Sequence, residues 1–134
     1  MILLDTHVVV WAVGDIPTLG RSARDIIARD ADCRVSAMVA WEVAMMAEKG
    51  RFTSDVPLDR WIGRSLRSLD AREVPVSVLI ATDAGSLKAG IHGDPCDRIM
   101  IATARALNCP LMTADEKILG YAAAGHLKAI DARV

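Results

Sequence analysis

The sequence predicts an α/β fold in which helices flank a central sheet of parallel strands. Short apolar runs without alternation, such as residues 1–4, are typical of strands that are buried on both faces. Segments with helical spacing separate these runs, and such an alternation implies parallel pairing. No repeat or linker-like stretch interrupts the pattern, so we expect a single domain over residues 1–134.

In the first half of the chain, the pattern indicates two strands and four helices. The strands are expected over residues 1–4 and 33–36, and the helices over residues 6–13, 21–30, 37–49 and 58–69. The helix at 37–49 has the clearest boundaries, because Ser36 is a suitable N-cap and Gly50 follows its end.

The second half is expected to continue the alternation. Strands are predicted over residues 72–74, 110–113 and 127–130, the last at the sheet edge, and helices over residues 76–87, 94–107 and 117–124. The helix at 94–107 has a well-marked start. Asp94 is a good N-cap, Pro95 fits the first turn, and Asp97 falls at the third helical position.

The composition limits the classes of function. The formal net charge of −1 excludes an overall basic protein, so an RNA substrate would need a local cationic patch or bound metal ions. Apolar residues make up 52% of the chain, an excess that indicates an apolar surface covered by a partner.

The cysteines and the first residues bear on the compartment. Cys33, Cys96 and Cys109 show neither zinc-ligand nor redox spacing, which favours three reduced thiols in a cytoplasmic protein. The first residues carry Asp5 and no basic segment, and they form neither a signal peptide nor a membrane span. We therefore expect no contact with a membrane.

Two acidic residues come directly after predicted strands. Asp5 ends the first apolar run, and Asp115 follows the run that ends at Thr113. In open α/β sheets, sites form beyond the carboxyl ends of the strands, which makes both residues site candidates. Each also has a plain structural explanation, because Asp is a common helix N-cap.

Two further acids lie in predicted helices. Glu42 has no cation three or four residues away and shares a face with apolar residues, so its burial would be costly without a metal or hydrogen bonds. An exposed Glu whose stem covers methionines is the alternative. Asp97 is favoured at its position by the helix dipole alone, yet Asp94 beside it is also acidic, and a divalent cation would relieve their repulsion.

Together, these four acids are more specific than any one of them. Parallel strand ends gather on one edge of a sheet, and several carboxylates offer the hard oxygen ligands that Mg²⁺ and Mn²⁺ prefer. Such ions can activate water and stabilise the leaving oxygen in phosphodiester cleavage.

Four stretches carry a family resemblance. They are LLDTHVVVW at residues 3–11, SAMVAWEVA at 36–44, HGDPCDRIMIATA at 92–104 and LMTADEKI at 111–118. In this order the chain resembles the PIN-domain ribonucleases, and most closely the VapC-type toxins of bacterial toxin–antitoxin systems. The resemblance implies a Rossmann-like sheet with a helical projection over residues 37–69, and Mg²⁺- or Mn²⁺-dependent endoribonuclease activity.

The resemblance also implies roles for individual residues. The acidic quartet of the family falls on catalytic, metal-binding positions, namely Asp5, Glu42, Asp97 and Asp115. Thr113 matches a hydroxyl residue that supports the quartet, and Thr6 is expected to orient Asp5 in a similar way. Asp94 is interpreted as the helix cap with a secondary role through water, and Arg98 as a contact to phosphate, to a partner or to a nearby acid.

The partners that the resemblance implies are an RNA substrate, a second copy of the chain in a homodimer, and a cognate antitoxin whose tail lies in a groove near the site. Trp11, Trp41 and Trp61 are candidates for these surfaces, and each is equally compatible with the core.

Two other functions fit parts of the pattern. A metallophosphoesterase uses Asp-x-His and Gly-Asp-x-x-Asp-Arg runs, which residues 5–7 and 93–98 imitate. Three histidines cannot complete its His-rich site, so His7 is expected to be structural or to support the site indirectly, and His92 and His126 to be loop residues. A non-catalytic PIN-like module that binds RNA or protein would be favoured by the loss of a quartet acid, and all four are present.

Overall fold

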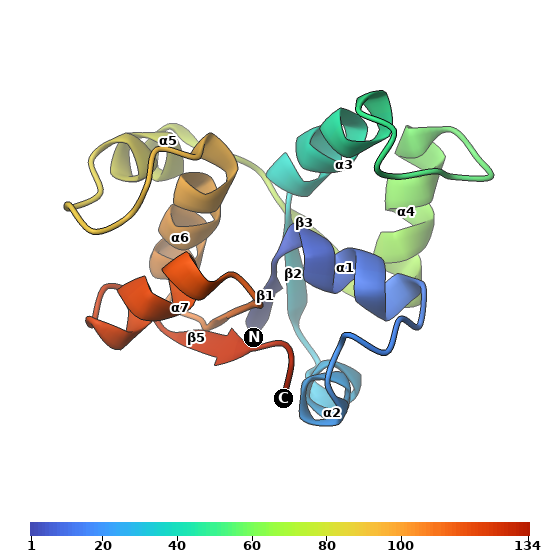
Figure 1. Ribbon diagram of the computed structural model, residues 1–134, viewed down its shortest axis with the longest axis horizontal. Coiled ribbons are helices and arrows are strands. Elements are labelled where there is room, and N and C mark those ends of the chain that lie inside the picture. Colours follow the sequence, from blue (N-terminus) through green and yellow to red (C-terminus); the bar gives the residue numbers. More distant parts are fainter.

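Five parallel strands form the central sheet of the computed structural model, which describes residues 1–134 (Figure 1). The spatial order is β3-β2-β1-β4-β5. The strands are β1 (Ile2–Leu4), β2 (Cys33–Ser36), β3 (Ala71–Val74), β4 (Leu111–Thr113) and β5 (Ala129–Asp131). All four neighbouring pairs are parallel, and Leu3 in the central strand is in register with Arg34 on one side and Leu111 on the other. The predicted fold class is confirmed.

Seven helices cover the sheet. They are α1 (Thr6–Val13), α2 (Arg21–Arg29), α3 (Met38–Glu48), α4 (Leu58–Ser68), α5 (Val78–Gly85), α6 (Pro95–Leu107) and α7 (Glu116–Ala123). In Figure 1, α1 to α4 lie to one side of the sheet and α5 to α7 to the other. None of these helices has the length and apolar character needed to cross a bilayer.

The strand order contains a reversal that positions the functional site. The chain runs outward from β1 to β2 and β3, then returns across the sheet to β4 and continues to β5. Right-handed crossovers place the helices of the two halves on opposite faces. The carboxyl ends of β1 and β4 therefore lie side by side at the point where the order reverses, which is where open α/β sheets bind ligands.

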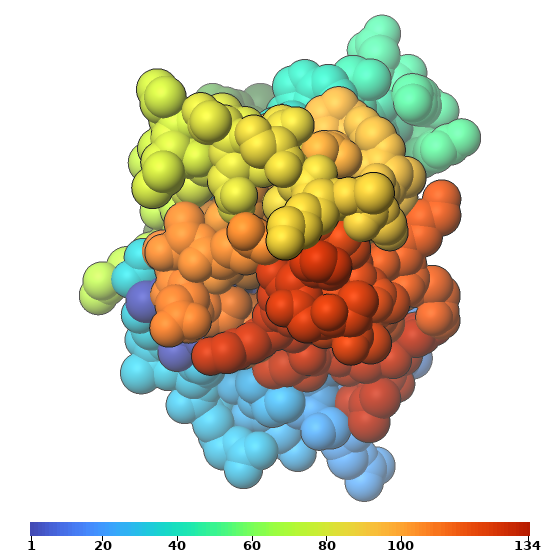
Figure 2. Space-filling view, turned by 90° about the vertical axis from the view of Figure 1, so that its left-hand side faces the viewer, coloured from blue at the N-terminus to red at the C-terminus, as the bar shows by residue number.

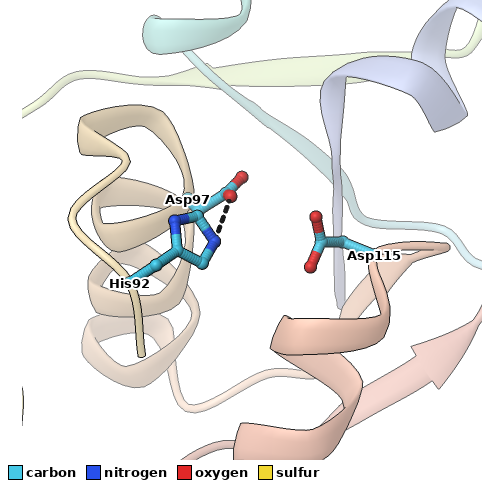
Figure 3. A group of neighbouring side chains, drawn as sticks. All are labelled: His92, Asp97 and Asp115. Atoms are coloured by element: carbon cyan, nitrogen blue, oxygen red, sulfur yellow. Dashed lines mark ion pairs between the residues drawn. The ribbon is translucent and has the colours of Figure 1, made fainter. Parts of the chain in front are cut away.

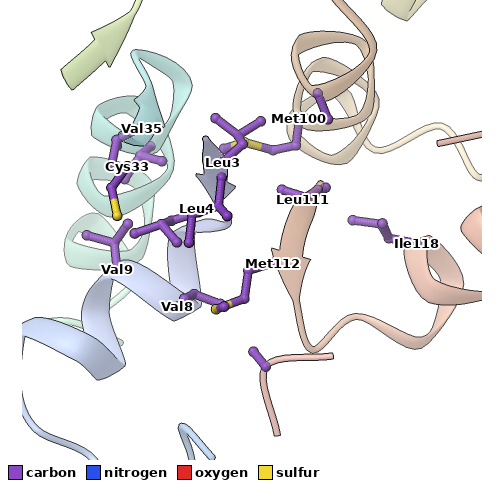
Figure 4. Close-up of a cluster of buried hydrophobic side chains, with 14 of the residues drawn as sticks. Leu3, Leu4, Val8, Val9, Cys33, Val35, Met100, Leu111, Met112 and Ile118 are labelled. Carbon is purple, nitrogen blue, oxygen red and sulfur yellow. The ribbon is translucent and has the colours of Figure 1, made fainter. Parts of the chain in front are cut away.

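The core lies around the two central strands (Figure 4). Leu3, Leu4, Leu111 and Met112 are fully buried, and Met100 of α6 packs in the same cluster. Burial on both faces explains why these strands read as unbroken apolar runs. All three cysteines are buried and unpaired, as expected from their spacing.

Capping side chains account for two of the shifts at helix starts. Ser77 accepts a hydrogen bond from the amide of Ile80, so α5 begins at Val78, and its span is shorter than the predicted 76–87. Asp115 caps α7, which starts one residue before the predicted 117. The helix predicted over 37–49 starts at Met38, and its N-cap is Ala37 and not the predicted Ser36, although the Ser36 hydroxyl accepts from the amide of Met38 at 3.1 Å.

The other boundary differences are small. Asp94 caps α6 as predicted, accepting from the amide of Asp97 at 3.1 Å, with Pro95 in the first turn. The last strand lies at the sheet edge as expected, although it spans Ala129–Asp131 and not residues 127–130. The remaining differences are of one residue at a helix or strand end.

One flank carries exposed apolar side chains on α5. Figure 2 faces this flank, with α5, the loop that follows it, α6 and α7 on the surface. The side chains of Val78 and Leu79 are 84% and 73% exposed. The apolar excess of the composition therefore does not all enter the core.

Candidate active site

A cleft of about 390 Å³ lies at the carboxyl ends of β1 and β4. Five acids line it, and they come from four separate segments of the chain. They are Asp5, Glu42, Asp94, Asp97 and Asp115. The structure thus brings the four predicted site residues together, and Asp94 joins them.

Asp5 is held firmly at the end of β1. Its side chain is only 8% exposed, and its two oxygens accept different hydrogen bonds. Oδ1 accepts from the amide of Thr6 at 2.8 Å, and Oδ2 accepts from the hydroxyl of Thr113 at 2.6 Å. Burial raises the pKa of Asp5 above its usual value, although both hydrogen bonds oppose the shift.

Thr113 connects two of the acids. Its hydroxyl donates to Asp5 and accepts from the amide of Asp115 at 3.1 Å. Oδ1 of Asp115 in turn accepts from the amides of Lys117 and Ile118, which fixes the carboxylate at the start of α7. The supporting position implied for Thr113 is the one that the geometry shows.

Thr6 contacts Asp5 in a different way from the one predicted. The hydroxyl of Thr6 is buried and has no hydrogen-bond partner. The backbone amide of Thr6 makes the contact, because Asp5 is the N-cap of α1 and receives its first free N–H. The contact of Thr6 with Asp5 is therefore present, but the backbone amide makes it and the hydroxyl does not.

Asp97 lies among the other carboxylates of the cleft. Burial and, to a smaller extent, repulsion by the carboxylates of Asp94, Asp115, Asp5 and Glu42 together raise its pKa to about 7. Its side chain is 16% exposed, so one end still reaches the cleft. In the metal-free chain Asp97 is half protonated near neutral pH.

His92, which the sequence reading assigned to a loop, also belongs to this site (Figure 3). Its Nε2 atom lies 2.9 Å from Oδ2 of Asp97, although the two atoms are not aligned as a hydrogen bond. Nδ1 accepts from the amide of Asp94 at 3.1 Å, so the neutral ring carries its proton on Nε2. The Nε2 edge of His92 therefore faces the Asp97 carboxylate, within the group of side chains that could hold a metal ion.

His92 stands two residues before the helix cap, inside the stretch 92–104. This position was the feature of the sequence that could have indicated a role for His92 in the site. It was not enough for a prediction, because the direction of the ring depends on the path of the loop before α6.

Glu42 reaches the cleft from α3 and makes no ion pair, as its helical neighbours predicted. Cys96 lies close to it at the start of α6. Burial and, to a smaller extent, the nearby Glu42 and Asp94 carboxylates together raise the pKa of the Cys96 thiol to about 12. Such an environment disfavours the thiolate, which is the nucleophilic form.

Arg98 does not face the acids. Its guanidinium donates to the carbonyl oxygens of Ala84, His92 and Gly85, the shortest contact being 2.8 Å to Ala84. These contacts tie the loop before α6 to the end of α5. Arg98 thus forms no ion pair with an acid, and the expected contacts to phosphate or to a partner stay predictions.

The other predicted residues divide among different environments. Trp61 is a core residue, whereas Trp11 is partly buried and lines the cleft, and Trp41 is 49% exposed. His7 also lines the cleft, and His126 stacks on Tyr121 outside it.

Comparisons with known proteins agree with this arrangement. The family model described as PIN domain matches residues 2–124. The chain belongs to the PIN domain family. It is 29% identical over 120 residues to Ribonuclease VapC22 of Mycobacterium tuberculosis, covering 90% of this chain and 91% of that protein.

Solved structures share the fold of this PIN domain. A toxin–antitoxin complex from Klebsiella pneumoniae contains a chain with a TM-score of 0.63 and 19% identity, covering 98% of this chain and 97% of that one. VapBC2 from Rickettsia felis, bound to a DNA fragment from its promoter, gives a TM-score of 0.67 at 18% identity, with coverage of 97% and 98%.

The donor set of this PIN domain fits a hard divalent cation. Ligand atoms of His92, Asp97 and Asp115 lie within 4.8 Å of one another, and the carboxylates of Asp5 and Glu42 line the same cleft. Carboxylate oxygens suit Mg²⁺ and Mn²⁺, and the mutual repulsion that raises the pKa of Asp97 is relieved by a bound cation. The carboxylates are the candidate ligands of this type, and His92 lies at the edge of the group.

Asp97→Asn should stabilise the metal-free protein in a pH-dependent way. The folded pKa of about 7 lies above the unfolded value near 4, so ionisation costs stability as the pH rises from about 4 to 7. Removing the ionisable group should therefore add on the order of 1–3 kcal/mol at pH 8, after allowance for solvent screening, and little at pH 4. Thermal melts in EDTA at both pH values measure this.

Asp25→Asn is the matched control, because Asp25 is exposed on α2 away from the cleft. An equal gain from Asp97→Asn at pH 4 and pH 8 would contradict the electrostatic account.

Thr113→Val should weaken Mn²⁺ binding, because the change removes the hydroxyl that joins Asp5 to the Asp115 amide. Loss of a group that orients metal ligands typically costs about 10- to 100-fold in affinity. Thr103→Val is the matched control, since Thr103 is also buried but donates only to the Ile99 carbonyl of its own helix. Calorimetric titration with Mn²⁺ measures both, and equal affinities for the two variants would refute the prediction.

Proposed function

We propose that this PIN domain is a metal-dependent endoribonuclease that acts in the cytoplasm as the toxin of a type II toxin–antitoxin system. The observation that carries the proposal is the cleft where four quartet acids meet beyond β1 and β4. The similarity to Ribonuclease VapC22 over 90% of the chain supports the activity. The fold shared with chains of toxin–antitoxin complexes supports the biological role.

We assign Asp5, Glu42, Asp97 and Asp115 as the residues that hold Mg²⁺ or Mn²⁺. When bound, such an ion supplies an activated water and charge stabilisation for the leaving oxygen of a phosphodiester. Asp5 and Asp115 are fixed by the Thr113 hydroxyl and by backbone amides, so their positions are preorganised. Asp97 must lose its proton to bind the cation, and the imidazole of His92 lies beside its carboxylate.

The proposal includes two protein partners. Because chains that share the fold come from toxin–antitoxin complexes, we propose that a cognate antitoxin covers the region of the cleft. We also propose a homodimer, for which the exposed Val78 and Leu79 of α5 offer apolar surface.

The purified chain, free of any partner, should cleave RNA in the presence of Mg²⁺ or Mn²⁺. We expect cleavage of a pool of structured RNAs to stop in EDTA and to fall by at least about a hundredfold in Asp97→Asn, since the variant lacks a charged ligand. Asp25→Asn, which changes an exposed acid outside the cleft, should cleave like the wild type. Gel analysis of end-labelled RNA measures the rates.

Cleavage that persists in EDTA, or that is equal in the wild type and Asp97→Asn, would refute the metal mechanism. Binding of RNA with no cleavage under any metal would favour a non-catalytic binding module.

Expression of the chain alone should arrest bacterial growth if it is a toxin. Asp5→Ala should relieve the arrest, because it removes the acid at the end of β1. Growth curves with immunoblots for soluble protein test this. Normal growth with verified wild-type expression would contradict the toxin role, while leaving the cleavage assay to judge the enzyme.

A further inference from the structure

A second hollow opens beside the acid cleft, between α1 and α3. It measures about 540 Å³ and shares His7, Trp11, Glu42 and Asp94 with the cleft lining. We call it the α1–α3 groove and define it by the remaining residues that the argument uses: Trp41, Met45, Lys49 and Arg51. Because the linings overlap, a bound chain can run from the acids into the groove without leaving the surface.

The groove adds two cations to the acids, Glu42 and Asp94, that it shares with the cleft. Lys49 and Arg51 are the only lysine or arginine residues that line either hollow. Both are exposed, and neither forms an ion pair with any acid of the chain. Their charge is therefore available to an anionic ligand, and it lies where a polyanion leaves the acid cleft.

Aromatic rings line the same path. The indole of Trp41 is 49% exposed, although tryptophan is usually well buried. At the junction with the cleft, the rings of His7 and Trp11 pack in a tilted pair with centroids 5.9 Å apart. Exposed aromatic faces next to cations are the combination that binds unpaired nucleotides, since each base offers a face for stacking and each linkage a phosphate.

We propose that the α1–α3 groove binds unpaired RNA nucleotides next to the cleaved phosphate, with Trp41 stacking on a base and Lys49 and Arg51 contacting backbone phosphates. The proposal rests on the ribonuclease function proposed above and assigns Trp41, Lys49 and Arg51 as substrate-binding residues outside the acid cleft. Paired bases are already stacked within a duplex, so they cannot present their faces to Trp41.

A segment of a protein partner is the competing occupant, because Trp41 and Met45 also suit an apolar side chain. The unpaired cations favour RNA. They lie at the end of a groove that continues into the proposed site of phosphodiester cleavage, where a polyanion must pass.

Binding and cleavage are measured separately. For binding, every protein carries Asp97→Asn in Mg²⁺ to prevent cleavage, and the probes are a fluorescein-labelled 12-nucleotide single-stranded RNA and the same sequence as a duplex. Anisotropy titrations over a range of KCl concentrations give the affinity and its salt dependence. We expect Trp41→Ala to weaken single-strand binding about tenfold and Trp41→Phe to restore most of the loss.

The Lys49→Gln/Arg51→Gln double variant should weaken binding and lower the slope of log affinity against log salt by about 1.4, as two lost phosphate contacts predict for a single strand. Val134→Ala and Lys128→Gln are matched controls, since they change an exposed apolar residue and an exposed cation outside the groove. Both should bind like the parent, and duplex binding should not respond to Trp41→Ala.

Single-strand affinity within twofold of the parent for both groove variants would overturn the proposal, and this is the result expected if the groove is reserved for a protein segment. Equal Mn²⁺ affinity and equal melting temperature of the variants in the active background verify that the acid cleft is intact.

If the wild type cleaves RNA but the groove variants bind and cleave equally well, only the groove proposal fails. If the wild type cleaves nothing, the ribonuclease proposal fails, and the anisotropy titration still judges the groove.

Discussion

The parallel pairing of β1 with β4 is the contact on which the rest of the structure depends. Leu3 is in register with Leu111, and the two strands are buried between the helical layers. Because both strands run in the same direction, the residues that follow them emerge on the same edge. The acids at these ends, Asp5 and Asp115, are brought together by backbone hydrogen bonding and apolar burial, although they lie at opposite ends of the sequence.

The ionised acids of the site lower the free energy of unfolding of the domain that holds them. Carboxylates in a partly buried cleft repel one another, and the raised pKa values of Asp5 and Asp97 record the cost of ionising them there. The fully buried side chains of β1, β4 and α6 supply the compensating stability. Thr113 and the amide at the start of α1 hold Asp5 without adding positive charge, which leaves a net negative potential for a cation.

The elements of the fold and the grouping of the acids could be predicted from the sequence because they depend on local patterns. Apolar runs marked the strands, and the position of an acid after a strand placed Asp5 and Asp115 at the sheet edge. The N-cap at Asp94 could be predicted for the same reason, because capping depends on residues that are neighbours in the sequence. Their catalytic roles stay predictions, because only geometry supports them here.

Side-chain directions could not be predicted, because tertiary contacts decide them. Arg98 is turned toward carbonyl oxygens of α5, which the sequence does not place beside it. His92 depends on the path of the loop before α6, and the Thr6 hydroxyl on the angle at which α1 leaves β1. The environments of the three tryptophans could not be predicted either. Trp61 lies in the core, Trp11 lines the cleft and Trp41 is exposed in the groove.

The hydrogen bond from Thr113 to Asp5 spans 108 positions of the chain, and this separation has a consequence for synthesis. A chain emerging from the ribosome exposes Asp5 at once, but the strand that holds Asp5 in place is among the last elements to be made. Until β4 joins the sheet, Asp5 lacks its hydroxyl donor and Asp115 is absent. Unfinished chains and fragments ending before β4 are therefore expected to be harmless, and a cell would meet the nuclease only when translation of the domain is nearly complete.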